Sequence, residues 1–99
     1  MQSFYPERFE RDMACAETDW LRWLPAAIGE LHWKLQSGAA GVRIGDGALG
    51  LKWRVAEPRV IGQVAMPHLL VDFRFAGVDE PQRSAFMKRF DLYMQRGGG

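Results

Sequence analysis

The chain has 99 residues and a mass of 11.3 kDa, which is enough for one domain but not for two. Its 47% hydrophobic and 25% charged residues are typical of a globular domain and argue against disorder except at the ends. The net charge of +1 excludes the strongly basic composition of many nucleic-acid-binding domains. We expect residues 1–96 to form a single domain and residues 97–99, which are all glycine, to be a flexible tail.

The sequence also bears on the cellular compartment. No apolar run approaches the ~20 residues that a membrane span requires, and the N-terminal residues lack the apolar core of a signal peptide. Cys15 is the single cysteine, so the chain has neither an internal disulfide nor a cysteine-based zinc site. We therefore expect a reduced, cytoplasmic setting without membrane association.

Residues 6–24 carry apolar side chains at helical spacing, which predicts an N-terminal helix. The apolar stripe consists of Phe9, Met13, Ala16, Trp20, Trp23 and Leu24. Pro6 suits a first helical turn, and we expect Pro25 to end the helix because a residue before proline avoids helical geometry. The intervening acidic and basic residues at positions 7–12 are typical of a solvated helix face.

From residue 31 onward the apolar residues alternate with polar ones, which is typical of antiparallel strands with one buried face. The expected strands span residues 31–36, 42–44, 49–55, 59–66 and 69–75, although the pattern of 59–66 does not distinguish its two faces. Turns are predicted at Ser37-Gly38, Gly45–Gly47, Glu57-Pro58 and Met66-Pro67. Such short connections join antiparallel neighbours, so the strands form a meander.

A second helix is predicted to begin at Asp79, which has a capping partner, Gln82, three residues later. Its apolar stripe comprises Phe86, Phe90, Tyr93 and Met94, with Met87 at the edge, and Gly97 is expected to stop it. The sequence therefore predicts an α+β fold: a two-layer sandwich in which an N-terminal and a C-terminal helix pack on one face of a four- or five-stranded antiparallel meander sheet.

Two groups of residues resemble functional motifs but lack the structural surroundings that those motifs need. Gly45, Gly47 and Gly50 spell a dinucleotide-binding string, with Asp72 downstream, yet the residues that follow alternate as a strand instead of opening a helix. A hairpin accounts for the same glycines. Cys15, His32 and His68 lie on separate expected elements, and a Cys-His dyad requires the fold to bring Cys15 against a histidine. We predict no catalytic residue, no cofactor and no metal site.

Strand parity places several cationic side chains on the sheet face that the helices leave open. These are His32, Lys34, Arg43, Lys52, Arg54 and Arg74, with Asp72 as the one acid. Such a face attracts anions or an acidic partner, and a plainly solvated face is the simpler interpretation. The strand aromatics face inward, which disfavours stacking on nucleic acid.

Two functional hypotheses follow. The first is a small, soluble, non-enzymatic module that binds another protein, or a second copy as a homodimer, through the basic sheet face or an edge strand. The alternative is a small-molecule binding or catalytic pocket between helices and sheet, lined by Trp20, Trp33 and Trp53 with Cys15 or His32 nearby.

Two segments carry a resemblance. Residues 11–25, RDMACAETDWLRWLP, and residues 89–99, RFDLYMQRGGG, are similar to a family of short uncharacterised proteobacterial proteins. That resemblance implies a bacterial protein and supplies no catalytic or binding residue. The order of elements is also superficially similar to small secretion chaperones, but those typically place a helix between strands, which this sequence lacks.

Overall fold

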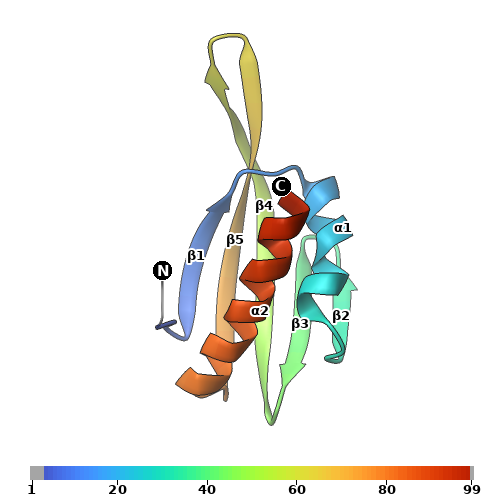
Figure 1. Cartoon of the computed structure of the whole chain (residues 1–99), viewed down its shortest axis with the longest axis vertical. Coiled ribbons are helices and arrows are strands. Elements are labelled where there is room, and N and C mark those ends of the chain that lie inside the picture. Colours follow the sequence, from blue (N-terminus) through green and yellow to red (C-terminus); the bar gives the residue numbers. More distant parts are fainter. Residues whose placement is uncertain (1–3, 99) are drawn as a thin grey trace.

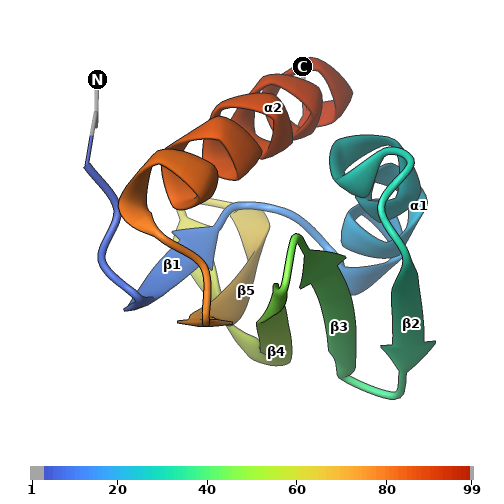
Figure 2. The same ribbon diagram turned by 90° about the horizontal axis from the view of Figure 1, so that it is seen from below.

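The computed structural model describes residues 4–98 and has five strands and two helices among them. They are β1 (Arg8–Met13), α1 (Glu17–Ile28), β2 (Trp33–Gln36), β3 (Ala39–Ile44), β4 (Gly47–Ile61), β5 (Val64–Ala76) and α2 (Glu80–Gly98). The strands form one antiparallel sheet in the order β1-β5-β4-β3-β2 (Figure 1). Both helices cover the same face of this sheet (Figure 2), so the predicted two-layer α+β sandwich is confirmed.

The core lies between the sheet and the helices and is rich in aromatic rings. Trp20 of α1 contacts Trp53 of β4 edge-on, at 5.4 Å between ring centroids, and contacts Phe90 of α2 at 5.8 Å. Phe90 also meets Phe73 of β5 at 5.5 Å. Edge-to-face pairs of this kind add to the hydrophobic stabilisation of the buried rings. The inward parity predicted for the strand aromatics is therefore confirmed.

The predicted helix over residues 6–24 is wrong in its first half. Residues 8–13 form strand β1, which pairs with β5 at the sheet edge, and α1 begins only at Glu17. Phe9, Arg11 and Met13 alternate toward the core, but a charged residue at the middle position hides that alternation in the sequence. Spacings of four between apolar residues fit either period, so the pattern alone does not separate the two structures.

Pro25 does not end α1, contrary to expectation, because the helix continues to Ile28. Proline removes one backbone donor, yet its ring lies exposed on the solvent side and the following residues still close the last turn. The Gly29 N–H donates to the Pro25 carbonyl at 2.9 Å, and Gly29 adopts a positive φ of 76°. The helix therefore stops at a glycine in a conformation that other residues rarely adopt.

The segment 59–66 is not a separate strand between two turns. β4 and β5 form one long hairpin whose turn is Gly62-Gln63, and its outer part projects beyond the rest of the sheet (Figure 1). The predicted turns at Glu57-Pro58 and Met66-Pro67 lie within the strands instead. A register irregularity between Ala56 and Arg59 accommodates Pro58, which has no N–H to offer the ladder.

Helix α2 begins as predicted. The Asp79 N–H donates to Gln82 Oε1 at 3.1 Å, and the Gln82 N–H donates to Asp79 Oδ1 at 2.9 Å, which is a reciprocal capping box. The predicted stop at Gly97 is wrong, since the helix runs to Gly98. Of the expected flexible tail, only Gly99 lies outside the described residues.

Candidate functional site

The cationic side chains of the open sheet face form an ordered pattern because the strand register is regular. In one row across the sheet, Lys34 of β2 lies opposite Gly41 of β3, which lies opposite Gly50 of β4, which lies opposite Arg74 of β5. The flanking row on one side contains Lys52, and the flanking row on the other contains Arg43. Two side-chain-free positions are thus surrounded by four cationic residues.

This arrangement leaves a depression of about 600 Å³ in the open face, which we call the basic hollow. Its lining residues are His32, Trp33, Lys34, Gln36, Ala39, Ala40, Gly41, Val42, Arg43, Ala48, Gly50, Leu51, Lys52, Asp72 and Arg74. The outward-facing positions of its floor hold only alanine and glycine, while long charged and polar side chains form the rim. Every lining residue lies on β2–β5 or at the entry to β2, so the hollow is open on the side away from the helices.

The fold itself does not require glycine on this floor. A Cβ atom added at Gly41 would have no neighbour within 4 Å, and one added at Gly50 would lie 3.8 Å from its nearest neighbour, the Arg74 carbonyl oxygen. Neither residue has a positive φ. Glycine in a strand interior weakens the strand, so the two glycines have a cost that no local contact explains.

The cations around the hollow are largely uncompensated. Among the described residues, Lys34, Arg43 and Lys52 form no ion pair. Arg74 is the exception, because its Nε lies 3.0 Å from Asp72 Oδ2, and Asp72 also lies 3.7 Å from the Nε of Arg8. Three exposed cations without an ion pair therefore surround a floor of glycine and alanine, and Asp72, the cross-strand neighbour of Lys52, is the one acid among the lining residues.

Five of the six cationic residues predicted from strand parity line the basic hollow. The sixth, Arg54, is exposed on the same face but lies opposite Leu70, nearer the projecting hairpin. The prediction that Asp72 is the only acid on this face is wrong. Because residues 8–13 form a strand, Glu10 and Asp12 also point outward from β1, together with Arg8. The acids of this face therefore lie on β1 and β5, whereas its cations lie on all five strands.

The sequence analysis missed the small residues of the floor: Ala39, Gly41, Ala48 and Gly50. Their signal is present in the sequence, since all four occupy the same outward parity as the neighbouring lysines and arginines. Only the register of the β3–β4 hairpin, which pairs Gly41 with Gly50, makes them adjacent.

The residues of the alternative pocket are not brought together. Trp20 and Trp53 pack against each other in the core, whereas Trp33 and the exposed His32 both line the basic hollow. Cys15 is buried in the connection between β1 and α1. No described contact joins it to His32 or to His68, whose Nδ1 lies 2.5 Å from Asp12 Oδ1.

A second polar cluster tethers β1 to α2 beneath the sheet edge. The Arg11 guanidinium donates to both carboxylate oxygens of Asp91, and the Tyr5 hydroxyl donates to Asp91 Oδ2 at 3.0 Å. The Arg11 guanidinium also lies over the Phe9 and Phe73 rings. Each polar group here has a partner, so the cluster is a structural tether that accounts for the inward orientation of Arg11.

The pKa values of two titratable groups near the core allow us to predict how the stability of the fold depends on pH. Burial raises the pKa of the Cys15 thiol above its usual value of 9.0, and the Asp19 carboxylate adds to this effect. Burial is likewise the main cause that raises the pKa of Tyr5 above 10.0, and the hydrogen bond of Tyr5 to Asp91 raises this pKa further. As the pH rises, the unfolded chain therefore loses these protons before the folded chain does.

We expect the free energy of unfolding to keep this contribution below about pH 9 and to lose it as the pH rises through 9 and 10. Urea unfolding followed by circular dichroism across the alkaline range measures it. Cys15→Ala should flatten the earlier part of the decline and Tyr5→Phe the later part. An unchanged slope in both variants would contradict the assignment.

No protein-family model matches the chain, and neither a curated protein nor a solved structure matches it significantly. Of the helices in the described part of the chain, neither is long and apolar enough to cross a membrane. The basic hollow is therefore interpreted from its own geometry and charge.

Proposed function

We propose that this chain is a non-enzymatic binding module that takes an acidic polypeptide segment in the basic hollow. The observation that supports it best is the set of unpaired cations, Lys34, Arg43 and Lys52, around a floor of two facing glycines. A carboxylate-bearing chain that crosses the sheet would meet these cations in turn, and opposite charges at an interface favour the correct partner and speed its approach.

The shape of the hollow favours a chain segment over a small molecule. Small-molecule sites usually enclose most of the ligand surface, whereas this hollow is lined from one sheet face only. A polypeptide gains contacts along its length and does not need enclosure. The outer edge of β2 is a weaker candidate for docking, because that strand has only four residues and Lys34 lies on it.

The position of the strand aromatics argues against nucleic acid as the ligand. Single-stranded nucleic acids bind sheets through bases that stack on exposed rings. Phe73 and Phe75 are buried under α2, and Trp33 packs against the core. The open face therefore offers charge without a stacking platform.

Charge reversal in the hollow tests the proposal. Lys52→Glu and Arg43→Glu are each expected to weaken binding of a fluorescein-labelled deca-glutamate peptide about tenfold, because each replaces an attraction with a repulsion. Fluorescence anisotropy at low ionic strength measures the Kd, and added salt should weaken wild-type binding. Lys88→Glu is the matched control, since Lys88 is exposed on α2 and far from the lining residues.

Filling the hollow gives a second, charge-neutral arm of the same experiment. Gly41→Val and Gly50→Val add side chains where the structure has space, and valine favours strands, so the variants should fold and yet bind the peptide poorly. Binding that survives both substitutions, or that responds equally to Lys88→Glu, would overturn the proposal. Binding of citrate without binding of the peptide would assign the site to small anions instead.

A further inference from the structure

The outer part of the β4–β5 hairpin, residues 55–68, projects from the body as a two-stranded arm. Beyond Lys52 and Leu69, neither β3 nor β1 accompanies it. Its apolar side chains Val55, Val60, Ile61 and Val64 are between 61% and 67% exposed, and Met66 is 40% exposed. Isolated two-stranded hairpins are only marginally stable in water, and exposed apolar surface of this kind marks an interaction site.

The arm is better suited to inserting side chains than to extending a sheet. Pro58 and Pro67 lie within its two strands, where neither offers an N–H to a further strand. Residues 60–67, which form its tip, contain no charged side chain. The nearest charges along β4 are those of Glu57 and Arg59. The arm thus presents an uncharged apolar knob with one acid and one base behind it.

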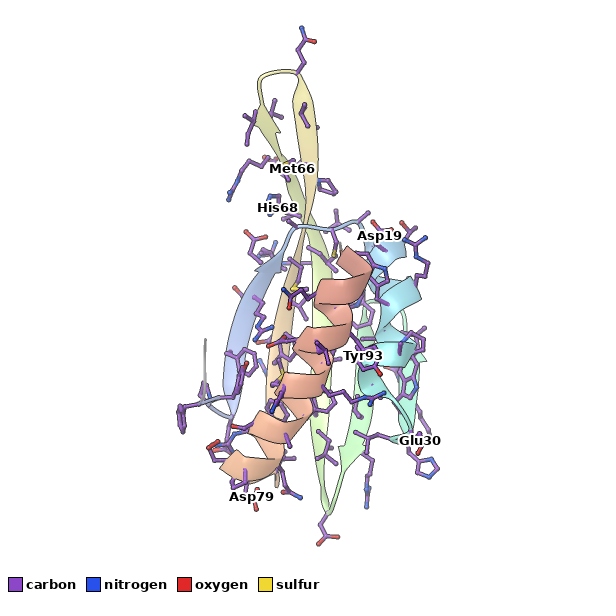
Figure 3. All side chains as sticks on the ribbon, in the orientation of Figure 1. Asp19, Glu30, Met66, His68, Asp79 and Tyr93 are labelled. Atoms are coloured by element: carbon purple, nitrogen blue, oxygen red, sulfur yellow. The ribbon has the colours of Figure 1, made fainter. Side chains whose placement is uncertain are left out.

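An apolar groove of about 490 Å³ lies at the other end of the molecule, where the end of α1 approaches the first half of α2. Its residues are Ile28, Glu30, Leu31, Ile44, Gln82, Ala85, Phe86 and Arg89. Figure 3 shows Met66 on the arm toward one end of the long axis and Glu30 toward the other end. Glu30 lines the groove, and the molecule extends 47 Å along this axis. The groove also carries one acid and one base, Glu30 and Arg89.

We infer that the arm tip of one copy docks in this groove of a second copy, head to tail. The apolar side chains Ile61 and Val64 would fill the groove over Leu31 and Phe86. The charges are complementary in number and sign, with Arg59 available to Glu30 and Glu57 available to Arg89. Among the described residues none of these four charged side chains has an ion pair. The Arg89 guanidinium donates to the Ala26 carbonyl oxygen at 3.3 Å and lies over the Tyr93 ring, so an ion pair with Glu57 would form beside those contacts.

The position of the two surfaces dictates the kind of assembly. A twofold dimer uses the same patch on both copies, whereas a knob and a groove at opposite ends give a heterologous contact that continues into open chains. The basic hollow on the open face takes no part in this contact, so the inference is independent of the acidic-ligand proposal and the two can fail separately.

Complementation between two variants tests the inference. The arm variant carries Ile61→Asp and Val64→Asp, and the groove variant carries Ala85→Glu and Leu31→Asp. We expect the average mass of the wild type in sedimentation equilibrium to rise steadily with concentration, and each variant alone to remain a monomer. An equimolar mixture should form a one-to-one heterodimer of twice the monomer mass, because the intact arm of one fits the intact groove of the other and the chain then ends. Leu92→Asp, at an exposed position on α2 outside the groove, should associate like the wild type.

Other results would overturn the inference. A wild-type chain that stays monomeric at all concentrations would exclude self-association. A groove variant that still dimerises, with no heterodimer in the mixture, would indicate a twofold contact between arms. An arm variant that loses adsorption to phosphatidylcholine vesicles, with no self-association in the wild type, would assign the arm to a lipid surface. Circular dichroism establishes that each variant is folded before the masses are compared.

Discussion

Trp20→Ala is expected to lower the free energy of unfolding by about 3–5 kcal/mol, the largest loss that we predict for a single side chain. Trp20 is fully buried and joins both layers of the fold, because its ring contacts Trp53 of the sheet and Phe90 of α2. Removing it leaves a cavity that the surrounding aromatic rings fill poorly. The midpoint of urea unfolding at unchanged m-value measures the loss.

The control for this prediction is Trp20→Phe. The indole Nε1 of Trp20 is buried without a hydrogen-bond partner, and such a group has a desolvation cost. Phenylalanine removes this unpaired N–H, which favours folding, but it also removes part of the ring volume, which costs packing. These two effects partly offset each other, so we expect the free energy of unfolding to fall by only about 1 kcal/mol. A loss as large as that of alanine would contradict the expectation that the buried indole N–H destabilises the fold.

Strand parity predicted much of the fold and part of the candidate site. The alternation around Val42, Leu51 and Phe73 has a single interpretation, so the inward and outward faces of three strands follow from the sequence. For the same reason the sequence alone predicts the cations of the basic hollow. Parity predicts which face a side chain occupies, but it does not predict that this face is covered: Leu35 of β2 and Val55 of β4 keep the expected alternation and are 52% and 65% exposed.

Parity fails where a tertiary contact stabilises a charged side chain at an inward position, because the sequence pattern leads us to expect an apolar residue there. Arg11 points into the protein because Asp91 and the rings of β1 and β5 receive it, and no local pattern reveals that partner. Parity also fails in the arm, for the opposite reason. Val60, Ile61 and Val64 are apolar on both faces of a hairpin with no core to cover either face, so their sequence resembles that of a buried strand.

The glycine floor of the basic hollow could not be predicted from the sequence for a third reason. A glycine in a strand has several explanations, and the sequence of Gly45, Gly47 and Gly50 suggests one motif where the structure has three separate roles. Gly45 has a positive φ in the β3–β4 turn, Gly47 approaches another backbone closely, and Gly50 leaves the hollow open. Only the three-dimensional surroundings of each position distinguish these roles.

Two strand glycines should therefore respond to alanine in opposite directions. A Cβ atom at Gly47 would lie well inside contact distance of the carbonyl oxygens of Ala76 and Gly77, which are backbone atoms and cannot rotate away. β4 and β5 would have to separate where Ala48 pairs with Ala76. We expect Gly47→Ala to cost about 3 kcal/mol, at the upper end of typical overpacking.

Gly41→Ala is the matched substitution, because Gly41 is also a strand glycine without a positive φ, yet a Cβ there meets nothing within 4 Å. Alanine restricts the unfolded chain more than glycine, so we expect Gly41→Ala to stabilise the fold by about 0.5–1 kcal/mol. Urea unfolding of both variants measures the difference. A stabilised Gly41→Ala chain that binds the acidic peptide less well would mean that this glycine is kept for the open floor of the hollow and not for the fold. A destabilised one would mean that the strand itself requires glycine, which would remove one support for a ligand at this site.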